Sequence, residues 1–408
     1  MRIKVGVIFG GESVEHEISI ISAIQAMNKI DEEKYEIVPI YITKDREWYT
    51  GEMLKDIDVY QDLNLIKTYG TNVVLYYKDG SFVLQKKRGL FKSIVKEIDI
   101  VFPIVHGTNV EDGGLQGYLQ TIGIPFVGPN VYGAAYGQDK TVMKDIWKHA
   151  GLPMTEYTWF YDIDYRNDPD KVIKEIEKIK YPLIVKPATT GSSVGIGICE
   201  DQKQLREAID EALQYDSKII VEEVVSNLKE VNIAVMGNYE YQKVSEIEEV
   251  LSANKFLTYN DKYIGGGKGK IKGGVKVPRG KSKGMASANR KLPADISSKM
   301  RDEIESIAVK AFKLLGSAGN SRIDFLIDDK TNKVYINEIN SIPGSLAYYL
   351  WEAKGMDFTK VLDEMITIGI KDFKRRTSKT HSFETNILAG YASNNGLKGT
   401  KGVKGKLK

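Results

Sequence analysis

The stretch "SRIDFLIDDKTNKVYINEINSIPG", residues 321–344, predicts two strands joined by a short turn. "RIDFLID" and "KVYINEIN" carry the apolar residues of buried strands, and "DDKTNK" between them is polar. Glu338 and Asn340 are two residues apart, so both point to the same face of their strand. If the two strands pair as a hairpin, Asp324 lies beside them and three side-chain oxygen donors converge.

Two carboxylates and an amide oxygen are hard ligands that suit Mg²⁺. The alternative is a solvated hairpin whose outer face is simply polar. Arg322 beside the cluster and Pro343-Gly344 directly after it favour the metal site. A cation and a flexible backbone next to a metal would stabilise charge that develops in a transition state.

The composition is that of an ordinary globular protein of two or three domains. The chain has 408 residues, of which 42% are hydrophobic and 28% charged. No apolar run reaches the roughly 20 residues of a membrane helix, and "MRIKVGVIFGG" lacks the apolar core of a signal peptide. The single Cys199 excludes an intramolecular disulfide and fits a reducing cytoplasm, and the net charge of +3 does not indicate nucleic-acid binding.

The first part of the chain alternates strands and helices, which predicts a parallel α/β sheet. Strands are expected at Val5–Phe9, "YEIVPIYIT" and "IDIVFPIVH". Ligands bind at the carboxyl ends of such strands. The residues that follow those ends, and are therefore candidates for a site, are Gly10, Gly11, Glu15 and His106.

The middle of the chain offers a second group of candidates. "TTGSSVGIG" (Thr189–Gly197) follows a strand that carries Lys186, and its glycines, hydroxyls and N–H groups suit an anion. A plain tight hairpin explains the same residues. Lys140, at the start of a helix, is either a second phosphate cation or a surface lysine. Glu222 and Glu223 end the strand "KIIVEE" and either accept from a nucleotide base or ribose or face solvent.

Residues 264–292 are rich in glycine and lysine and show no hydrophobic period, which predicts a long mobile loop. The alternative to a ligand-covering lid is a solvated basic loop. None of the four histidines, nor Cys199, stands in a pattern typical of a nucleophile or a zinc site.

Together these motifs resemble the ATP-grasp superfamily and, within it, the D-alanine–D-alanine ligases. The matching segments run in the family's order from Val5 to about Asp372: "IFGGESVEHEISIISA", "VFPIVHGTNVEDGGLQGYLQTIGIPFVGPN", "GQDKTVMK", "IVKPATTGSSVGI", "IIVEEVV", "DKY", "SRIDFLID" and "INEINSIPG". The resemblance implies a three-domain α/β ATP-grasp fold. An N-terminal parallel α/β domain (1–130) is followed by central (131–230) and C-terminal (231–375) α+β domains that enclose ATP, and by a tail (376–408).

The resemblance also implies roles for individual residues. Lys140 and Lys186 would contact the ATP phosphates, and the base and ribose would meet Glu222, Glu223, Val225 and Glu230. Two Mg²⁺ ions, or Mn²⁺, would be held by Asp324, Glu338 and Asn340. Glu15 would bind the first D-alanine's ammonium and be linked through Ser192 to Tyr263. Other contacts to the reacting groups and substrates would come from His106, Lys262, Arg322, the Gly344 backbone N–H, Tyr349 and Leu350.

The implied reaction makes an acyl phosphate from a carboxylate and ATP, which an amine then attacks. Phosphoryl transfer needs positioning and charge neutralisation rather than a protein nucleophile, which fits a site of lysines, an arginine and oxygen donors. A non-catalytic nucleotide-binding regulator would lack these residues. We therefore expect an ATP-dependent amide ligase that supplies peptidoglycan precursor. It would be cytoplasmic, a homodimer by family, with small-molecule substrates and neither nucleic acid nor membrane as partner.

One departure from the family concerns the second substrate. Where the family has a serine that grips the acceptor's carboxylate, this chain has Tyr349. The acceptor pocket should differ in depth, so a sister ligase with a different acceptor amino acid is the alternative. Tyr263, which in the family accompanies an amine acceptor, favours amide over ester formation.

Overall fold

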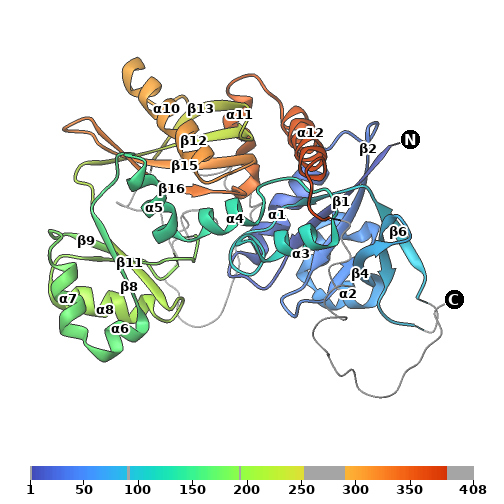
Figure 1. The fold of residues 1–408 in the computed structure, drawn as a ribbon, viewed down its shortest axis with the longest axis horizontal. Coiled ribbons are helices and arrows are strands. Elements are labelled where there is room, and N and C mark those ends of the chain that lie inside the picture. The colour runs from blue at the N-terminus through green and yellow to red at the C-terminus, as the bar shows by residue number, and fades with distance from the viewer. Residues whose placement is uncertain (1, 90–91, 193, 252–289, 384–408) are drawn as a thin grey trace, which may run out of the picture.

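The computed structural model describes residues 2–89, 92–192, 194–251 and 290–383. They form three sheets with helices packed on them (Figure 1). The N-terminal part contains β1 (Ile3–Gly10), α1 (His16–Met27), β2 (Tyr35–Ile42), β3 (Trp48–Thr50), η1 (Glu52–Lys55), η2 (Ile57–Gln61), α2 (Leu63–Tyr69), β4 (Thr71–Lys78), β5 (Ser81–Lys86), β6 (Ile94–Ile98), β7 (Ile100–Pro103) and α3 (Gly114–Ile122).

The middle and C-terminal parts supply the other two sheets. The middle contains α4 (Val131–Gln138), α5 (Lys140–His149), β8 (Tyr157–Tyr161), α6 (Asp162–Asn167), α7 (Pro169–Ile176), β9 (Leu183–Pro187), β10 (Gly197–Cys199), α8 (Gln202–Ala212) and β11 (Lys218–Glu223). The C-terminal part contains β12 (Leu228–Gly237), β13 (Gln242–Val250), β14 (Arg290–Lys291), α10 (Ser298–Leu314), β15 (Gly319–Asp328), β16 (Lys333–Asn340), η4 (Gly344–Ala347), α11 (Tyr348–Glu352) and α12 (Phe358–Thr377).

The first sheet has the order β6-β5-β4-β3-β2-β1-β7 and is only partly parallel. β2, β1 and β7, the three strands expected from the sequence, are parallel. The prediction of a parallel sheet is wrong for β3–β6, which extend it with antiparallel pairs. The signal for this extension is Asp79-Gly80 between "TNVVLYYK" and "SFVLQK", two runs rich in β-branched and aromatic residues. Both residues have positive φ (49° and 90°), as a tight hairpin turn requires.

The other two sheets have the orders β10-β9-β11-β8 and β14-β13-β12-β15-β16. β15 and β16 form the expected antiparallel hairpin, with Asp324 opposite Glu338 and Arg322 opposite Asn340. Cys199 is buried in β10.

Each sheet has its own hydrophobic core. α10 and α5 pack on the five-stranded sheet, and α6, α7 and α8 on the four-stranded one. The core of the first sheet continues into α11 and α12. α12 buries positions 358, 361, 362, 365, 366 and 369, the spacing of one helical face, and begins with Asp357 accepting from the Lys360 N–H. Among the described residues, no helix has the length and apolar character needed to cross a bilayer.

Candidate functional site

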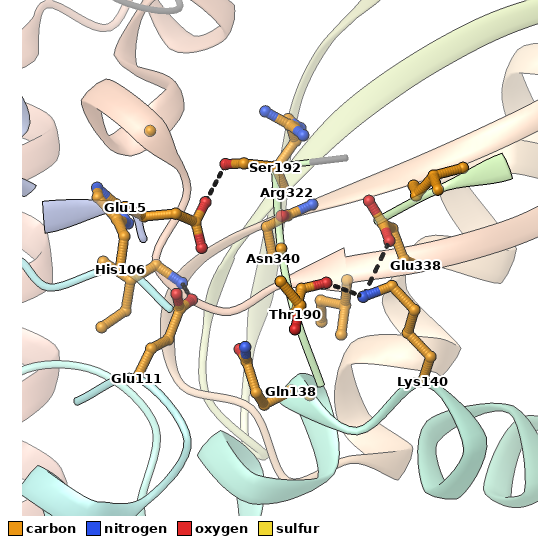
Figure 2. A pocket seen from close by; sticks show the side chains of 16 residues that line it. Glu15, His106, Glu111, Gln138, Lys140, Thr190, Ser192, Arg322, Glu338 and Asn340 are labelled. Atoms are coloured by element: carbon orange, nitrogen blue, oxygen red, sulfur yellow. Dashed lines mark hydrogen bonds and ion pairs between the residues drawn. The ribbon is translucent and has the colours of Figure 1, made fainter. Parts of the chain in front are cut away.

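One cavity collects side chains from all three sheets (Figure 2). Glu15, His106 and Glu111 lie on one side of it, and Lys140 and Glu338 on the opposite side. Nine of the residues that the sequence singled out line it: Glu15, His106, Lys140, Ser192, Arg322, Glu338, Asn340, Gly344 and, from the loop 189–197, Thr190. The structure therefore brings these distant segments together in one cavity, and their roles there remain predictions.

Glu15 and His106 lie past the carboxyl ends of the neighbouring parallel strands β1 and β7. The Ser192 hydroxyl donates a hydrogen bond to Glu15, which joins the first and second sheets. A Cβ atom at Gly191 would lie 2.6 Å from Oε2 of Glu15, so a larger residue there would displace this carboxylate. Nε2 of His106 lies 3.0 Å from the Ser22 hydroxyl on α1. The first-sheet side of the cavity is thus a fixed array of polar groups.

Glu111 is a cavity residue to which the sequence analysis assigned no role. Its carboxylate accepts hydrogen bonds from the Gly107 N–H (3.0 Å), the Ile342 N–H (2.9 Å) and the Ser341 hydroxyl (3.0 Å). It therefore connects the loop after β7 to the turn after β16. Burial, together with the charge of Glu15, raises the pKa of Glu111 to about 8. The available signal was its place in "HGTNVEDGG", five residues after His106.

Unfolding in urea should show a pH dependence that Glu111 controls. Between pH 6.5 and 8 the folded chain retains the Glu111 proton that the unfolded chain has lost, so stability should fall as pH rises, by about 2 kcal/mol at most. Burial lowers the pKa of His106 to about 4, which gives the opposite slope, but only below pH 6.5. Glu111→Gln should abolish the fall above pH 6.5, and an unchanged slope in that variant would contradict the assignment.

Lys186 belongs to a buried ion triad. Oε1 of Glu222 lies 3.0 Å from Nζ of Lys186, and Oε2 lies 2.9 Å from Nζ of Lys144. Burial alone would raise the pKa of Glu222, but the two ammonium groups lower it to about 2. Lys144 was not predicted, although it lies four residues after Lys140 on the same helix. The triad fixes Lys186 beside the cavity, near Glu338, whose charge helps to raise the pKa of Lys186 against the effect of burial.

Lys140 lies on the far wall of the cavity. Its ammonium donates to the Thr190 carbonyl at 2.9 Å and lies 3.9 Å from Oε2 of Glu338 (Figure 2). The loop that supplies Thr190 is held by Asp216, which accepts from the Thr189 N–H at 2.7 Å. A cation is therefore held against the glycine-rich loop, as anion binding requires.

The candidate nucleotide residues lie along β11 and β12, outside the lining of this cavity. Glu222 is buried in the triad, whereas Glu223, next to it, is exposed. Val225 is buried and Glu230 is partly buried on β12. Glu230 is close enough to Lys186 for its charge to raise that lysine's pKa. Contacts of these four residues with a nucleotide remain a prediction.

The donor set on β15 and β16 is chemically suited to Mg²⁺. In the described part of the chain no three His, Cys, Asp or Glu side chains form a metal group; here the third donor is the amide of Asn340. Asp324 accepts two bonds from Arg322, Nε to Oδ1 at 2.6 Å and Nη2 to Oδ2 at 2.7 Å. The Asn340 amide donates to Oδ2 at 3.1 Å. A carboxylate has about four lone-pair positions, so these bonds leave Asp324 capacity for a cation beside Glu338.

The turn after β16 has a backbone that the sequence did not predict. Ser345, Leu346 and Ala347 are buried and all have positive φ, at 53°, 50° and 45°. Non-glycine residues in this region are strained by about 1–3 kcal/mol each. Ser22 accepts from the Ser345 N–H at 2.9 Å, and the Asn320 amide donates to the Leu346 carbonyl at 2.6 Å. These contacts hold the turn that presents Gly344 to the cavity.

Tyr349 and Leu350 lie on α11, buried behind that turn. The Tyr349 hydroxyl donates to Oε1 of Glu248 at 3.2 Å, and the Arg290 guanidinium lies 3.8 Å from the centre of its ring. Arg290 also pairs with Glu248, Nη1 to Oε2 at 2.7 Å. The sequence analysis did not identify Glu248 and Arg290, because neither belongs to a sequence motif. The substrate contacts of Tyr349 and Leu350 remain predictions.

Lys262, Tyr263 and most of the predicted lid (264–292) lie outside the described residues. The last residues of that segment, Arg290–Lys291, form β14 and pair with β13.

Comparison with known proteins gives consistent matches over most of the chain. The family model described as D-ala D-ala ligase N-terminus matches residues 4–129, and the D-ala D-ala ligase C-terminus model matches 146–291 and 279–367. The D-alanine–D-alanine ligase of Thermosipho africanus (strain TCF52B) is 40% identical over 387 residues, 95% of this chain and 98% of that protein.

Solved structures agree with the sequence matches. The D-alanine-D-alanine ligase from Coxiella burnetii superposes with a TM-score of 0.75 at 27% identity, covering 92% of this chain and 96% of that one. The VanG D-Ala:D-Ser ligase from Enterococcus faecalis gives 0.73 at 29% identity, covering 90% and 100%.

Proposed function

The chain belongs to the D-alanine–D-alanine ligase family, and we propose that it joins two D-alanine molecules at the expense of ATP, by way of an acyl phosphate, for peptidoglycan precursor synthesis. One observation supports this most: the acidic group for an ammonium, Glu15, shares a cavity with Lys140, Arg322 and the oxygen donors of β16.

In the proposed reaction, a carboxylate oxygen of the first D-alanine attacks the γ-phosphorus of ATP and ADP leaves. The amine of the second D-alanine, having lost a proton, then attacks the acyl carbon. The bond between the acyl carbon and the phosphate oxygen breaks, and phosphate leaves. Glu15, held by Ser192, would bind the first ammonium. Lys140, Lys186 and Arg322 would neutralise the transferring phosphoryl group, and the Gly344 N–H would donate to the oxyanion.

Asp324, Glu338 and Asn340 would hold two Mg²⁺ ions, which when bound would neutralise phosphate charge. The candidate nucleotide residues, Lys262, Tyr263 and the lid keep the roles implied by the family. We infer a cytoplasmic enzyme and a homodimer on the same grounds. The proposal is tested by ADP release with D-alanine as the sole amino acid and detection of the dipeptide; ADP release without dipeptide would reject it.

A different acceptor amino acid is the alternative to D-alanine, because the chain is also similar to the structure of a D-Ala:D-Ser ligase. Tyr349→Ser should change the ratio of kcat/KM for D-serine over D-alanine as acceptor at least tenfold. The reason is that it removes the ring on which Arg290 stacks and the donor to Glu248. The KM of the first D-alanine should stay within about twofold, measured by ADP release over a panel of D-amino acids.

Two further variants act as controls for Tyr349. Tyr349→Phe keeps the ring and deletes only the hydroxyl. Tyr348→Ser removes the neighbouring phenol, which stacks on Phe358 at 4.4 Å between ring centres rather than on Arg290. If Tyr348→Ser shifts the acceptor ratio as strongly as Tyr349→Ser, the effect comes from loosening α11 and not from Tyr349.

A further inference from the structure

A second cavity, of about 310 Å³, lies where the segment after α3, the β12–β13 turn, the α10–β15 loop and the C-terminal end of α12 meet. Among the described residues it shares no lining residue with the cavity of Figure 2. Its walls are largely apolar and include Phe126, Tyr239 and Phe373. A cavity of this size and character can take a small ligand, and none of the roles proposed above uses it.

Arg376 is a cation of this cavity that contacts aromatic rings rather than a carboxylate among the described residues. Its guanidinium carbon lies 5.3 Å from the ring centre of Phe126 and 5.5 Å from that of Phe373. In residues 2–89, 92–192, 194–251 and 290–383, no carboxylate pairs with Arg376, whereas its neighbour Arg375 pairs with two. Burial lowers the pKa of Arg376, as expected of a partly desolvated cation without a counter-ion. An anion placed here would supply the missing charge.

Ser317 provides a second, independent sign of a ligand. The residue is one of those that line the cavity and is 3% exposed, yet within the described chain its hydroxyl has no hydrogen-bond partner. Buried hydroxyls are normally paired, and one without a partner in a cavity wall can donate to a ligand. Lys379 also lines the cavity, and the one carboxylate in the lining, Asp372, is occupied by Arg375 and Asn238.

We propose that this cavity binds a small organic anion with an apolar body. Its carboxylate or phosphate head would contact Arg376 and accept from Ser317, and its body would lie against Phe126 and Phe373.

The backbones beside the cavity are closely packed at two positions. A Cβ atom at Gly369 of α12 would be 2.9 Å from the Phe126 carbonyl, and one at Gly319 would be 3.0 Å from the Gly128 Cα. The occupant would therefore touch the first sheet's final segment, α12 and the loop that enters β15. β15 carries Arg322 and Asp324, so the ligand would bridge elements from both sides of the candidate active site.

Saturation-transfer NMR on the full chain tests the proposal with three probes of one shape: benzoate, phenyl phosphate and benzyl alcohol. At least one of the two anions should bind saturably. Its affinity should fall at least tenfold in Arg376→Gln and about threefold or more in Ser317→Ala. Benzyl alcohol should bind at least tenfold more weakly than the better anion. The ranking of benzoate against phenyl phosphate identifies the preferred head group.

Lys374→Gln is the matched control. It removes one positive charge from the same turn of α12, but Lys374 is exposed and outside the lining, so binding should stay within twofold. Arg376→Lys keeps the charge and should bind better than Arg376→Gln. Equal loss in Lys374→Gln and Arg376→Gln, equal binding of benzyl alcohol, or no saturable binding would each overturn the proposal. ADP release with D-alanine is measured separately, so failure here leaves the proposed ligase function unaffected.

Discussion

Arg322→Lys should lower kcat by about 10²–10³-fold while leaving the KM for the first D-alanine within a few-fold of wild type. The guanidinium uses two of its five N–H donors on Asp324, at 2.6 and 2.7 Å, and also lines the cavity. It can therefore orient the carboxylate and stabilise phosphoryl charge together. A lysine ammonium has one centre, so it can serve only one of these purposes well.

The measurement is steady-state ADP release, with the melting temperature of each variant as a check on folding. Arg301→Lys is the matched control, because Arg301 pairs with Glu246 on β13, outside the cavity. It should retain kcat within about twofold. An Arg322→Lys enzyme with kcat within fivefold of wild type would show that the fork geometry is not needed and that any cation suffices.

The hairpin of β15 and β16 was predictable because its information is local. Period-two alternation places Glu338 and Asn340 on one face, and the polar turn sets the register as far as Phe325 opposite Ile336. A β-bulge between Phe325 and Asp324, which the sequence did not predict, then brings Asp324 opposite Glu338. The same holds for Glu15 and His106, which follow apolar strands at the edge where parallel sheets bind ligands. In each case a few neighbouring residues determine the position of a side chain.

The unpredicted parts depend on contacts between residues far apart in the sequence. The carboxylate of Glu111 is held by Ser341 and Ile342, which lie 230 and 231 residues away in the sequence. The left-handed turn of residues 345–347 contains no glycine that would indicate positive φ in the sequence. It depends on Ser22 and Asn320, which lie 323 and 26 residues from their partners in the turn. Such positions follow from tertiary packing, and the local sequence does not show which distant partners they contact.

The buried triad is the other place where a single change should have a large effect. Glu222→Gln should lower the free energy of unfolding by about 3–5 kcal/mol, because it leaves two ammonium groups buried around a neutral amide. Glu222 is 1% exposed and Lys144 is also 1% exposed, so water cannot replace the lost charge. Urea denaturation at pH 7 measures the difference.

Lys144→Met distinguishes the effect of unbalanced charge on the free energy of unfolding from the effect of lost packing. It removes one cation and leaves Glu222 paired with Lys186 at 3.0 Å, so its cost should be smaller than that of Glu222→Gln. Burial lowers the pKa of Lys144 despite Glu222, which marks it as the lysine whose charge is less well compensated. The double variant Glu222→Gln/Lys144→Met should be more stable than Glu222→Gln alone, since one uncompensated cation is gone. If the two single effects simply add, the ions are not coupled and the triad does not hold Lys186 in place.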